Sequence, residues 1–189
     1  MKTALLVVDM VNDFTQPDGL VYYPQNKEVL PIISKVVDYF HKTDNMVVFF
    51  RHSYRAGKYD KNLETMRLCC VEGTGGDEID SSLTVLDKDY VIKKRRYSGF
   101  FGTDLDLVLR ENKIERVVIV GTKTNNCIRA TATDAYYRDY DTIVLSDCVA
   151  TNSDVVNQVH LEDIDKYIGT VMLSDEIIKL MEEERRETI

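Results

Sequence analysis

An apolar run that stops at a glycine and continues into a helical pattern constrains this chain more than any other feature. Residues 116–135 read R-V-V-I-V-G-T-K-T-N-N-C-I-R-A-T-A-T-D-A. Residues 117–120 show no polar alternation, which is typical of a strand in a parallel sheet that is buried on both faces. Beyond Gly121 and a polar turn, apolar and small residues recur at helical spacing, at Ile128, Ala132 and Ala135. The stretch therefore predicts a buried strand, a turn and a helix.

Cys127 lies at this predicted junction, in the first turn of the helix. Backbone N–H groups without partners and the helix dipole favour a negative charge at such a position. We therefore expect a thiol with a lowered pKa, whose thiolate would serve as a nucleophile. The alternative is a small buried cysteine that only fills the core.

Similar apolar runs recur along the chain and alternate with helical patterns. Strands are expected at residues 4–8, 46–50, 90–92, 117–120, 142–145 and 168–173, and helices at 27–42, 103–112, from 128, at 153–166 and from 174. This alternation predicts an α/β fold, a three-layer, Rossmann-like α/β/α sandwich around a six-stranded parallel sheet. The length predicts one domain over residues 1–189.

Four residues follow the predicted strands closely enough to meet at one edge of the sheet. They are Asp9, His52, Lys94 and Cys127. In folds of this class, ligands bind outside the carboxyl ends of the strands. The irregular, charged segment 54–89 is long for a connection, which indicates a lid or a binding loop. We therefore expect a site at this edge and expect the long segment to set its specificity.

A cysteine, a carboxylate and a lysine form a workable set for nucleophilic catalysis. Asp9 can accept the thiol proton, and Lys94 can hold the carboxylate and stabilise the thiolate. Backbone N–H groups of Lys123 and Cys127 can form an oxyanion hole. The alternatives are that Asp9 caps a turn and that Lys94, in the basic run 93–96, is solvated.

The composition restricts the partners of the protein. The formal net charge is −8, which offers no basic face to nucleic acid or to anionic lipid. No apolar run approaches the roughly 20 residues that span a membrane. The first residues lead directly into a strand and the four cysteines form no C-x-x-C pair, so we expect a cytoplasmic protein with free thiols.

Three motifs together resemble the cysteine hydrolases of the isochorismatase-like superfamily. They are V-V-D-M-V-N-D-F at residues 7–14, K-R-R-Y-S-G-F-F-G-T-D-L at 94–105 and G-T-K-T-N-N-C-I-R-A-T-A-T-D-A at 121–135. The resemblance spans residues 4–171 and is strongest to the N-carbamoylsarcosine amidase and nicotinamidase-related branch. It implies Asp9, Lys94 and Cys127 as the catalytic triad. It also implies a cis peptide bond between Thr122 and Lys123, and a homo-dimer or homo-tetramer.

The function implied by this resemblance is cysteine-dependent amidohydrolysis. The chain would cleave a C–N bond of a small carbamoyl (ureido) compound or amide, such as N-carbamoylsarcosine, through a thioester. A nicotinamidase is the first alternative, but nicotinamidases hold a metal with an Asp-x-His element, and residues 49–55 read F-F-R-H-S-Y-R. We therefore expect no metal and no cofactor. The second alternative is a non-catalytic protein that binds a ligand or senses redox state through Cys127.

Candidates for substrate binding come from the matching motifs and from the strand ends. They are Phe14, His52, Tyr97, Arg96 and Arg129. Guanidinium groups bind carboxylates well, and Arg51 and Arg55 are further candidates for such a contact. The alternative for each arginine is an ordinary place on the surface.

Overall fold

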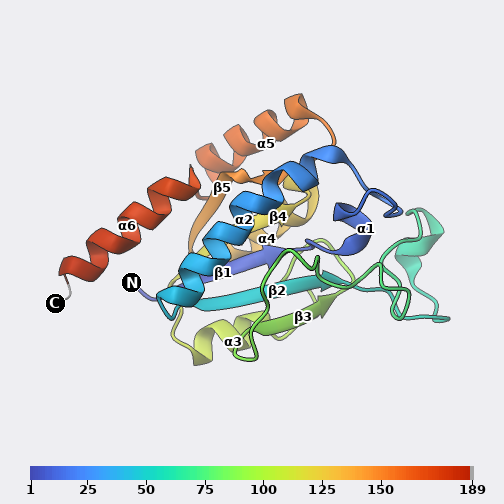
Figure 1. Ribbon diagram of the computed structural model, residues 1–189, viewed down its shortest axis with the longest axis horizontal. Helices are drawn as coiled ribbons and strands as arrows, with labels where there is room; N and C mark the ends of the chain where they lie inside the picture. The colour runs from blue at the N-terminus through green and yellow to red at the C-terminus, as the bar shows by residue number, and fades with distance from the viewer. Residues whose placement is uncertain (188–189) are drawn as a thin grey trace.

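The computed structural model describes residues 1–187, and its centre is a parallel sheet in the order β3-β2-β1-β4-β5-β6 (Figure 1). All five pairs of neighbouring strands run parallel. The strands are β1 (Thr3–Val8), β2 (Met46–His52), β3 (Tyr90–Lys94), β4 (Arg116–Thr122), β5 (Asp141–Ala150) and β6 (Thr170–Met172). The predicted α/β class and the six-stranded sheet are confirmed.

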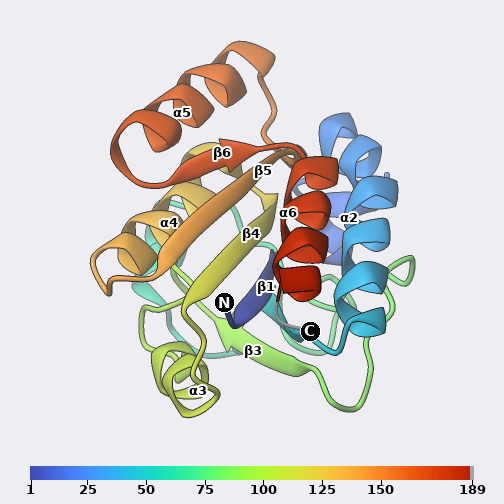
Figure 2. The ribbon, with the colours of Figure 1, turned by 90° about the vertical axis from the view of Figure 1, so that its left-hand side faces the viewer.

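Helices cover both faces of this sheet (Figure 2). They are α1 (Asn12–Thr15), α2 (Pro24–Lys42), α3 (Leu105–Glu111), α4 (Arg129–Tyr136), α5 (Asp154–Tyr167) and α6 (Ser174–Glu187), with a 3₁₀ turn η1 (Lys61–Glu64) and a π-helical turn η2 (Thr124–Ile128). The helices α2 and α6 lie on one face, and α3, α4 and α5 lie on the other. None of the helices in residues 1–187 is both long and apolar enough to cross a membrane.

Strand β1 explains why the apolar runs lack alternation. Ala4, Leu6 and Val8 pack into the cluster beneath α3, α4 and α5. Leu5 and Val7 pack into the opposite cluster, beneath α2 and α6. Because successive side chains of a strand point to opposite faces, a strand covered on both sides is apolar throughout.

Some strands and helices begin or end at other residues than expected, and several of these residues lie near the site. Strands β2 and β3 each continue two residues further than predicted, so His52 and Lys94 are their last residues. Residues 12–15 form α1 where a loop was expected. Helix α3 begins at Leu105, and Thr103 accepts a hydrogen bond from the Leu105 amide at 3.3 Å without being the N-cap. Helix α5 lies within one residue of the expected range 153–166, and the Ser153 hydroxyl at its N-cap accepts from the Val156 amide.

The connection 53–89 folds against the carboxyl end of the sheet, at the right of Figure 1. The Asp80 amide donates to the Met10 carbonyl at 2.9 Å, and the Asn12 amide donates to the Glu78 carbonyl at 2.9 Å. Near its start, a bridge joins Tyr54 to Val71. The connection is therefore held beside the residues that follow β1 and β2.

Candidate active site

Asp9 and Lys94 form a fully buried ion pair at the carboxyl ends of β1 and β3. The Lys94 Nζ donates to Asp9 Oδ2 at 2.6 Å, and both side chains have no exposed surface. Lys94 also donates to the Arg96 carbonyl at 3.0 Å. Lys93, the preceding residue of β3, instead points outward to Glu72. Strand alternation therefore places one lysine of the basic run inside the protein and its neighbour outside.

One oxygen of the Asp9 carboxylate takes no part in the ion pair with Lys94. Its Oδ1 is buried and has no hydrogen-bond partner. Burial by itself lowers the pKa of Lys94, but Asp9 and Cys127 outweigh it and raise this pKa above its ordinary value. Lys94 therefore keeps its positive charge beside Asp9, and the Asp9 oxygen without a hydrogen-bond partner is available to a proton donor beside it.

Cys127 lies in η2, directly after β4, and is 6% exposed. Burial raises the pKa of its thiol to about 12; the Lys94 charge lowers it, and the Asp9 charge raises it again. The expected lowering of this pKa is therefore wrong for the protein without substrate. Burial next to a carboxylate outweighs the helix terminus, so the thiol needs a base to become a nucleophile.

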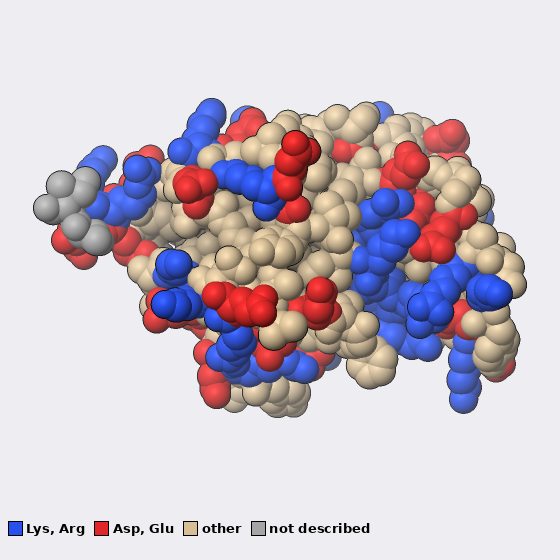
Figure 3. Space-filling model, turned by 90° about the horizontal axis from the view of Figure 1, so that it is seen from below, with Lys and Arg blue, Asp and Glu red and all other residues tan. Residues whose placement is uncertain are grey.

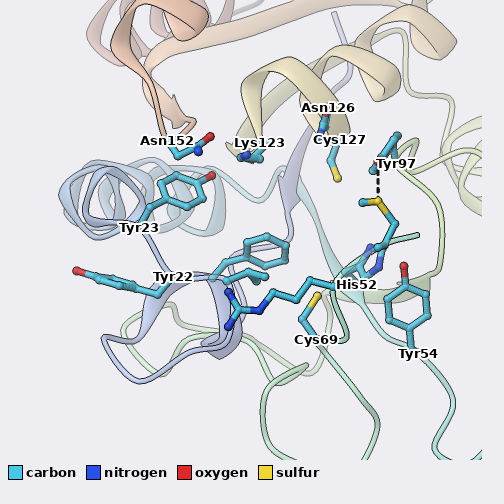
Figure 4. A pocket seen from close by; sticks show the side chains of 14 residues that line it. Tyr22, Tyr23, His52, Tyr54, Cys69, Tyr97, Lys123, Asn126, Cys127 and Asn152 are labelled. Atoms are coloured by element: carbon cyan, nitrogen blue, oxygen red, sulfur yellow. Dashed lines mark hydrogen bonds between the residues drawn. The ribbon is translucent and has the colours of Figure 1, made fainter. Parts of the chain in front are cut away.

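The Cys127 thiol faces a cavity of about 380 Å³ (Figure 4). This volume suits a small molecule. The walls come from the segments that follow β1, β2, β3, β4 and β5. The lining residues are Phe14, Val21, Tyr22, Tyr23, His52, Tyr54, Met66, Arg67, Cys69, Tyr97, Lys123, Asn126, Cys127 and Asn152.

Three of the five predicted substrate-binding residues line this cavity, namely Phe14, His52 and Tyr97. The other two do not. Arg96 pairs with Asp60 at 3.1 Å, and Arg129 of α4 pairs with Asp163 of α5. Neither guanidinium group faces Cys127, because each is held by a carboxylate outside the cavity.

The two further arginine candidates are also outside the cavity. Arg51 donates to Asp77 at 2.7 Å, and Arg55 lies in a separate surface depression. The sequence shows that these arginines are near the strand ends, but it does not show which carboxylate forms an ion pair with each arginine.

His52 is a neutral imidazole at the floor of the cavity. Burial lowers its pKa to about 4, and the Asp9 and Lys94 charges act on it in opposite directions. Its ring packs edge-on against Tyr54, with 4.8 Å between the ring centroids. At neutral pH this side chain therefore presents polar nitrogen atoms without a charge.

The backbone at residues 122–127 turns sharply between β4 and α4. The Thr122–Lys123 peptide bond is cis, as expected. The Lys123 carbonyl accepts from the amides of Asn126 and Ile128. Lys123 directly precedes η2 and Cys127 lies within it, so both amides belong to the turn that follows β4.

The donor atoms near Cys127 do not fit a metal ion. Within residues 1–187, no group of three or more His, Cys, Asp or Glu side chains is arranged to hold one. His52 is followed by Ser53, whose hydroxyl donates to Asp77.

Several lining residues were not predicted from the sequence. They are chiefly Arg67, Cys69, Tyr23 and the side chain of Lys123. Arg67 and Cys69 belong to the long segment for which only a general role in specificity was predicted. For Lys123 the sequence predicts a role for the backbone amide only. Its position next to the nucleophile turn also indicates that its side chain lies at the site.

The sequence matches a family model and curated proteins over most of its length. The family model described as the isochorismatase domain matches residues 3–176. The ureidoacrylate amidohydrolase RutB of Acinetobacter baylyi is 30% identical, over 90% of this chain and 80% of its own length. A probable inactive nicotinamidase of Arabidopsis thaliana is also 30% identical, over 89% of this chain and 90% of its own length.

Solved structures share the whole fold. An isochorismatase-like hydrolase from Alkaliphilus metalliredigens has a TM-score of 0.91 and 33% identity, covering 96% of this chain and all of that chain. The N-carbamoylsarcosine amidase from Thermoplasma acidophilum has a TM-score of 0.83 and 34% identity, covering 93% and 98%. A nicotinamidase from Bacillus subtilis has a TM-score of 0.86 and 27% identity, covering 91% and 100%.

Proposed function

The chain belongs to the isochorismatase family of hydrolases, and we propose that it is a cysteine-dependent amidohydrolase. Its substrate is a small carbamoyl (ureido) compound or amide, such as N-carbamoylsarcosine, and a C–N bond is cleaved. The names of similar proteins support this class, because they include an N-carbamoylsarcosine amidase and a ureidoacrylate amidohydrolase. The observation that carries the proposal is the buried Asp9–Lys94 pair beside Cys127, with one Asp9 oxygen free.

The first half of the reaction acylates Cys127. Asp9 takes the thiol proton as Sγ attacks the substrate carbonyl, which the raised thiol pKa makes necessary. The backbone amides of Lys123 and Cys127, in the turn after β4, donate to the oxyanion that forms. Asp9 then passes the proton to the departing nitrogen, and the C–N bond breaks to give ammonia or an amine and a thioester.

The second half releases the acid. Asp9 accepts a proton from water, and the resulting hydroxide attacks the thioester carbonyl. The tetrahedral intermediate expels the Cys127 sulfur, which regains its proton from Asp9. Lys94 keeps the Asp9 carboxylate in place and offsets its charge throughout, because its Nζ donates to Asp9 Oδ2 and both side chains are buried.

Nicotinamide is the second candidate substrate. Aromatic residues line much of the cavity, including Phe14, Tyr22 and Tyr23, and they offer flat surfaces to a pyridine ring. A nicotinamidase is also among the structures with the same fold. Nicotinamide is disfavoured because, within residues 1–187, no group of three or more His, Cys, Asp or Glu side chains is arranged to hold the metal that nicotinamidases use.

Ammonia release from a small panel tests the proposal. The panel contains N-carbamoylsarcosine, other N-carbamoyl amino acids, ureidoacrylate, nicotinamide and simple amides, each with the wild-type chain and with Cys127→Ala. We expect release from a ureide or an amide that depends on Cys127. Release from nicotinamide alone, sensitive to a chelator, would favour the second candidate. No release from any compound, together with reversible oxidation of Cys127, would favour a binding or redox-sensing protein.

A further inference from the structure

The cavity beside Cys127 is cationic although the chain is acidic. Of the fourteen residues that line it, Arg67 and Lys123 carry positive charge and none carries a carboxylate. The formal net charge of the chain is −8. A cavity whose charge opposes that of the whole protein favours a ligand of negative charge.

Arg67 is not held by a carboxylate of the described residues. Other arginines beside the cavity, such as Arg51 and Arg96, are held by carboxylates. Arg67 takes part in no ion pair or hydrogen bond there, and it is exposed at the mouth of the cavity. A guanidinium group presents several donors in one plane, which match the two oxygens of a carboxylate.

Lys123 provides the second cation, next to the nucleophile turn. Its Nζ lies 5.6 Å from the centre of the Tyr23 ring and forms no ion pair with a described residue. Burial lowers its pKa, and the Cys127 charge opposes this. Figure 4 shows Lys123 and Cys127 on the same wall of the cavity, across from Cys69 and His52.

The surface around the cavity continues the positive charge. Figure 3 shows Lys and Arg side chains gathered at the right-hand end of the molecule, where Figure 1 draws the connection 53–89. A depression there is lined by more basic than acidic side chains, namely Arg55, Lys93, Lys94, Arg95 and Arg96 against Glu72, although Lys93 pairs with Glu72 and both Arg95 and Arg96 pair with Asp60. A neighbouring depression contains Arg96 and also Met66 and Tyr97, which line the cavity. The basic surface therefore reaches the cavity.

We propose that the substrate carries a carboxylate, which Arg67 and Lys123 bind while its scissile carbonyl lies at Cys127. This inference rests on the proposed function and narrows it to acidic ureides and acidic amides. Arg67 would determine specificity from the long connection, and Lys123 would do so from the nucleophile turn. Neutral compounds with the same reacting group would bind less tightly, because they leave both cations without a partner.

A matched pair of probes tests the inference by binding, without turnover. N-carbamoylglycine carries a carboxylate, and propylurea has the same ureide with a neutral tail. Calorimetry on the Cys127→Ala chain should show that N-carbamoylglycine binds about 10- to 100-fold more tightly than propylurea, the range of a charge-assisted contact. Adding Arg67→Ala or Lys123→Gln should remove most of this preference. Arg55→Ala, which removes a nearby cation outside the cavity, should leave it unchanged.

The outcomes separate this inference from the proposed function. Three binding results would overturn the inference. The two probes could bind equally well, neither could bind, or the preference for N-carbamoylglycine could survive both Arg67→Ala and Lys123→Gln. Ammonia release from propylurea as fast as from N-carbamoylglycine would also overturn it, while the proposed hydrolysis would stand. A carboxylate preference that needs Arg67, in a wild-type chain that hydrolyses no ureide or amide, would support the inference and reject the proposed function.

Discussion

At the scale of single residues, the buried ion pair of Asp9 and Lys94 gives the sharpest prediction. Asp9→Asn leaves the Lys94 charge buried without its partner, and Lys94→Met does the same to Asp9. Each single variant should lower the free energy of unfolding by about 3–5 kcal/mol. The double variant removes both charges and should regain much of that loss, while hydrolysis stays abolished. Urea denaturation and ammonia release measure the two effects.

Two results would count against this account of the pair. A double variant no more stable than the less stable single variant would mean that the charges do not act on each other as described. A single variant at Asp9 that keeps normal turnover would show that another group takes the thiol proton.

Because the pKa of His52 is lower in the folded chain than in the unfolded chain, we expect the protein to lose stability in acid. Unfolded, it binds a proton near pH 6.5, whereas in the folded chain its pKa is about 4. Between these values the unfolded state binds more protons, so the free energy of unfolding falls as the pH falls, by at most about 3 kcal/mol. His52→Gln should lose this part of the pH dependence. Urea titrations at pH 7 and pH 4.5 measure it, and identical pH dependence in both chains would contradict it.

Residue patterns predicted positions better than electrostatic environments. Asp9, Lys94 and Cys127 could be found because each stands at the end of a predicted strand, and the structure brings them together. The pKa of Cys127 was predicted in the wrong direction, because local sequence shows a helix terminus but not burial beside Asp9. Arg67 could not be separated from the paired arginines, since pairing depends on contacts between distant segments.

At the scale of elements, Gly121 controls how β4 approaches β1. Its φ is +115°, and a Cβ atom there would lie 2.1 Å from the Val8 carbonyl oxygen. Gly121→Ala should force the two strands apart, lower the free energy of unfolding by at least about 2 kcal/mol and reduce hydrolysis. Gly102→Ala is a matched control, because Gly102 also has a positive φ, +65°, but open space around it. Equal effects of the two substitutions in thermal unfolding would contradict this role.

Elements with a strong apolar pattern were predictable, and their ends were not. Every strand of the sheet was expected from its apolar residues. The last residues of β2 and β3 are Arg51-His52 and Lys93-Lys94, whose polar side chains carry no strand pattern. The short helix α1 was missed because four residues contain too few turns to show a period.

At the scale of the whole molecule, Lys and Arg side chains gather at the end where the connection 53–89 lies, on a chain of net negative charge. If this end guides an acidic substrate, the kcat/KM for N-carbamoylglycine should fall when the NaCl concentration rises from 20 to 500 mM, roughly the range over which the screening length shortens from about 20 Å to 4 Å. The kcat/KM for propylurea should change little over this range. Steady-state ammonia release measures both, and equal salt dependence would contradict guidance by charge.

The site itself is a property of the whole chain. Its parts follow five different strands, and only the parallel sheet makes them neighbours. A fold class read from the sequence was therefore enough to predict the edge at which the site lies. We propose that the choice of substrate depends on the connection 53–89, whose path could not be predicted from the sequence. A single domain over residues 1–189, a cytoplasmic location and a homo-dimer or homo-tetramer stay predictions.

The central claim is that Cys127 becomes acylated during turnover. Mass spectrometry of acid-quenched protein, with peptide mapping, tests it most directly on whichever compound of the panel releases ammonia. The account predicts an adduct of the substrate acyl or carbamoyl group on the peptide that contains Cys127, formed as fast as ammonia appears, and no adduct or turnover in Cys127→Ala. Ammonia release that continues in Cys127→Ala, or an adduct on a different residue, would contradict it.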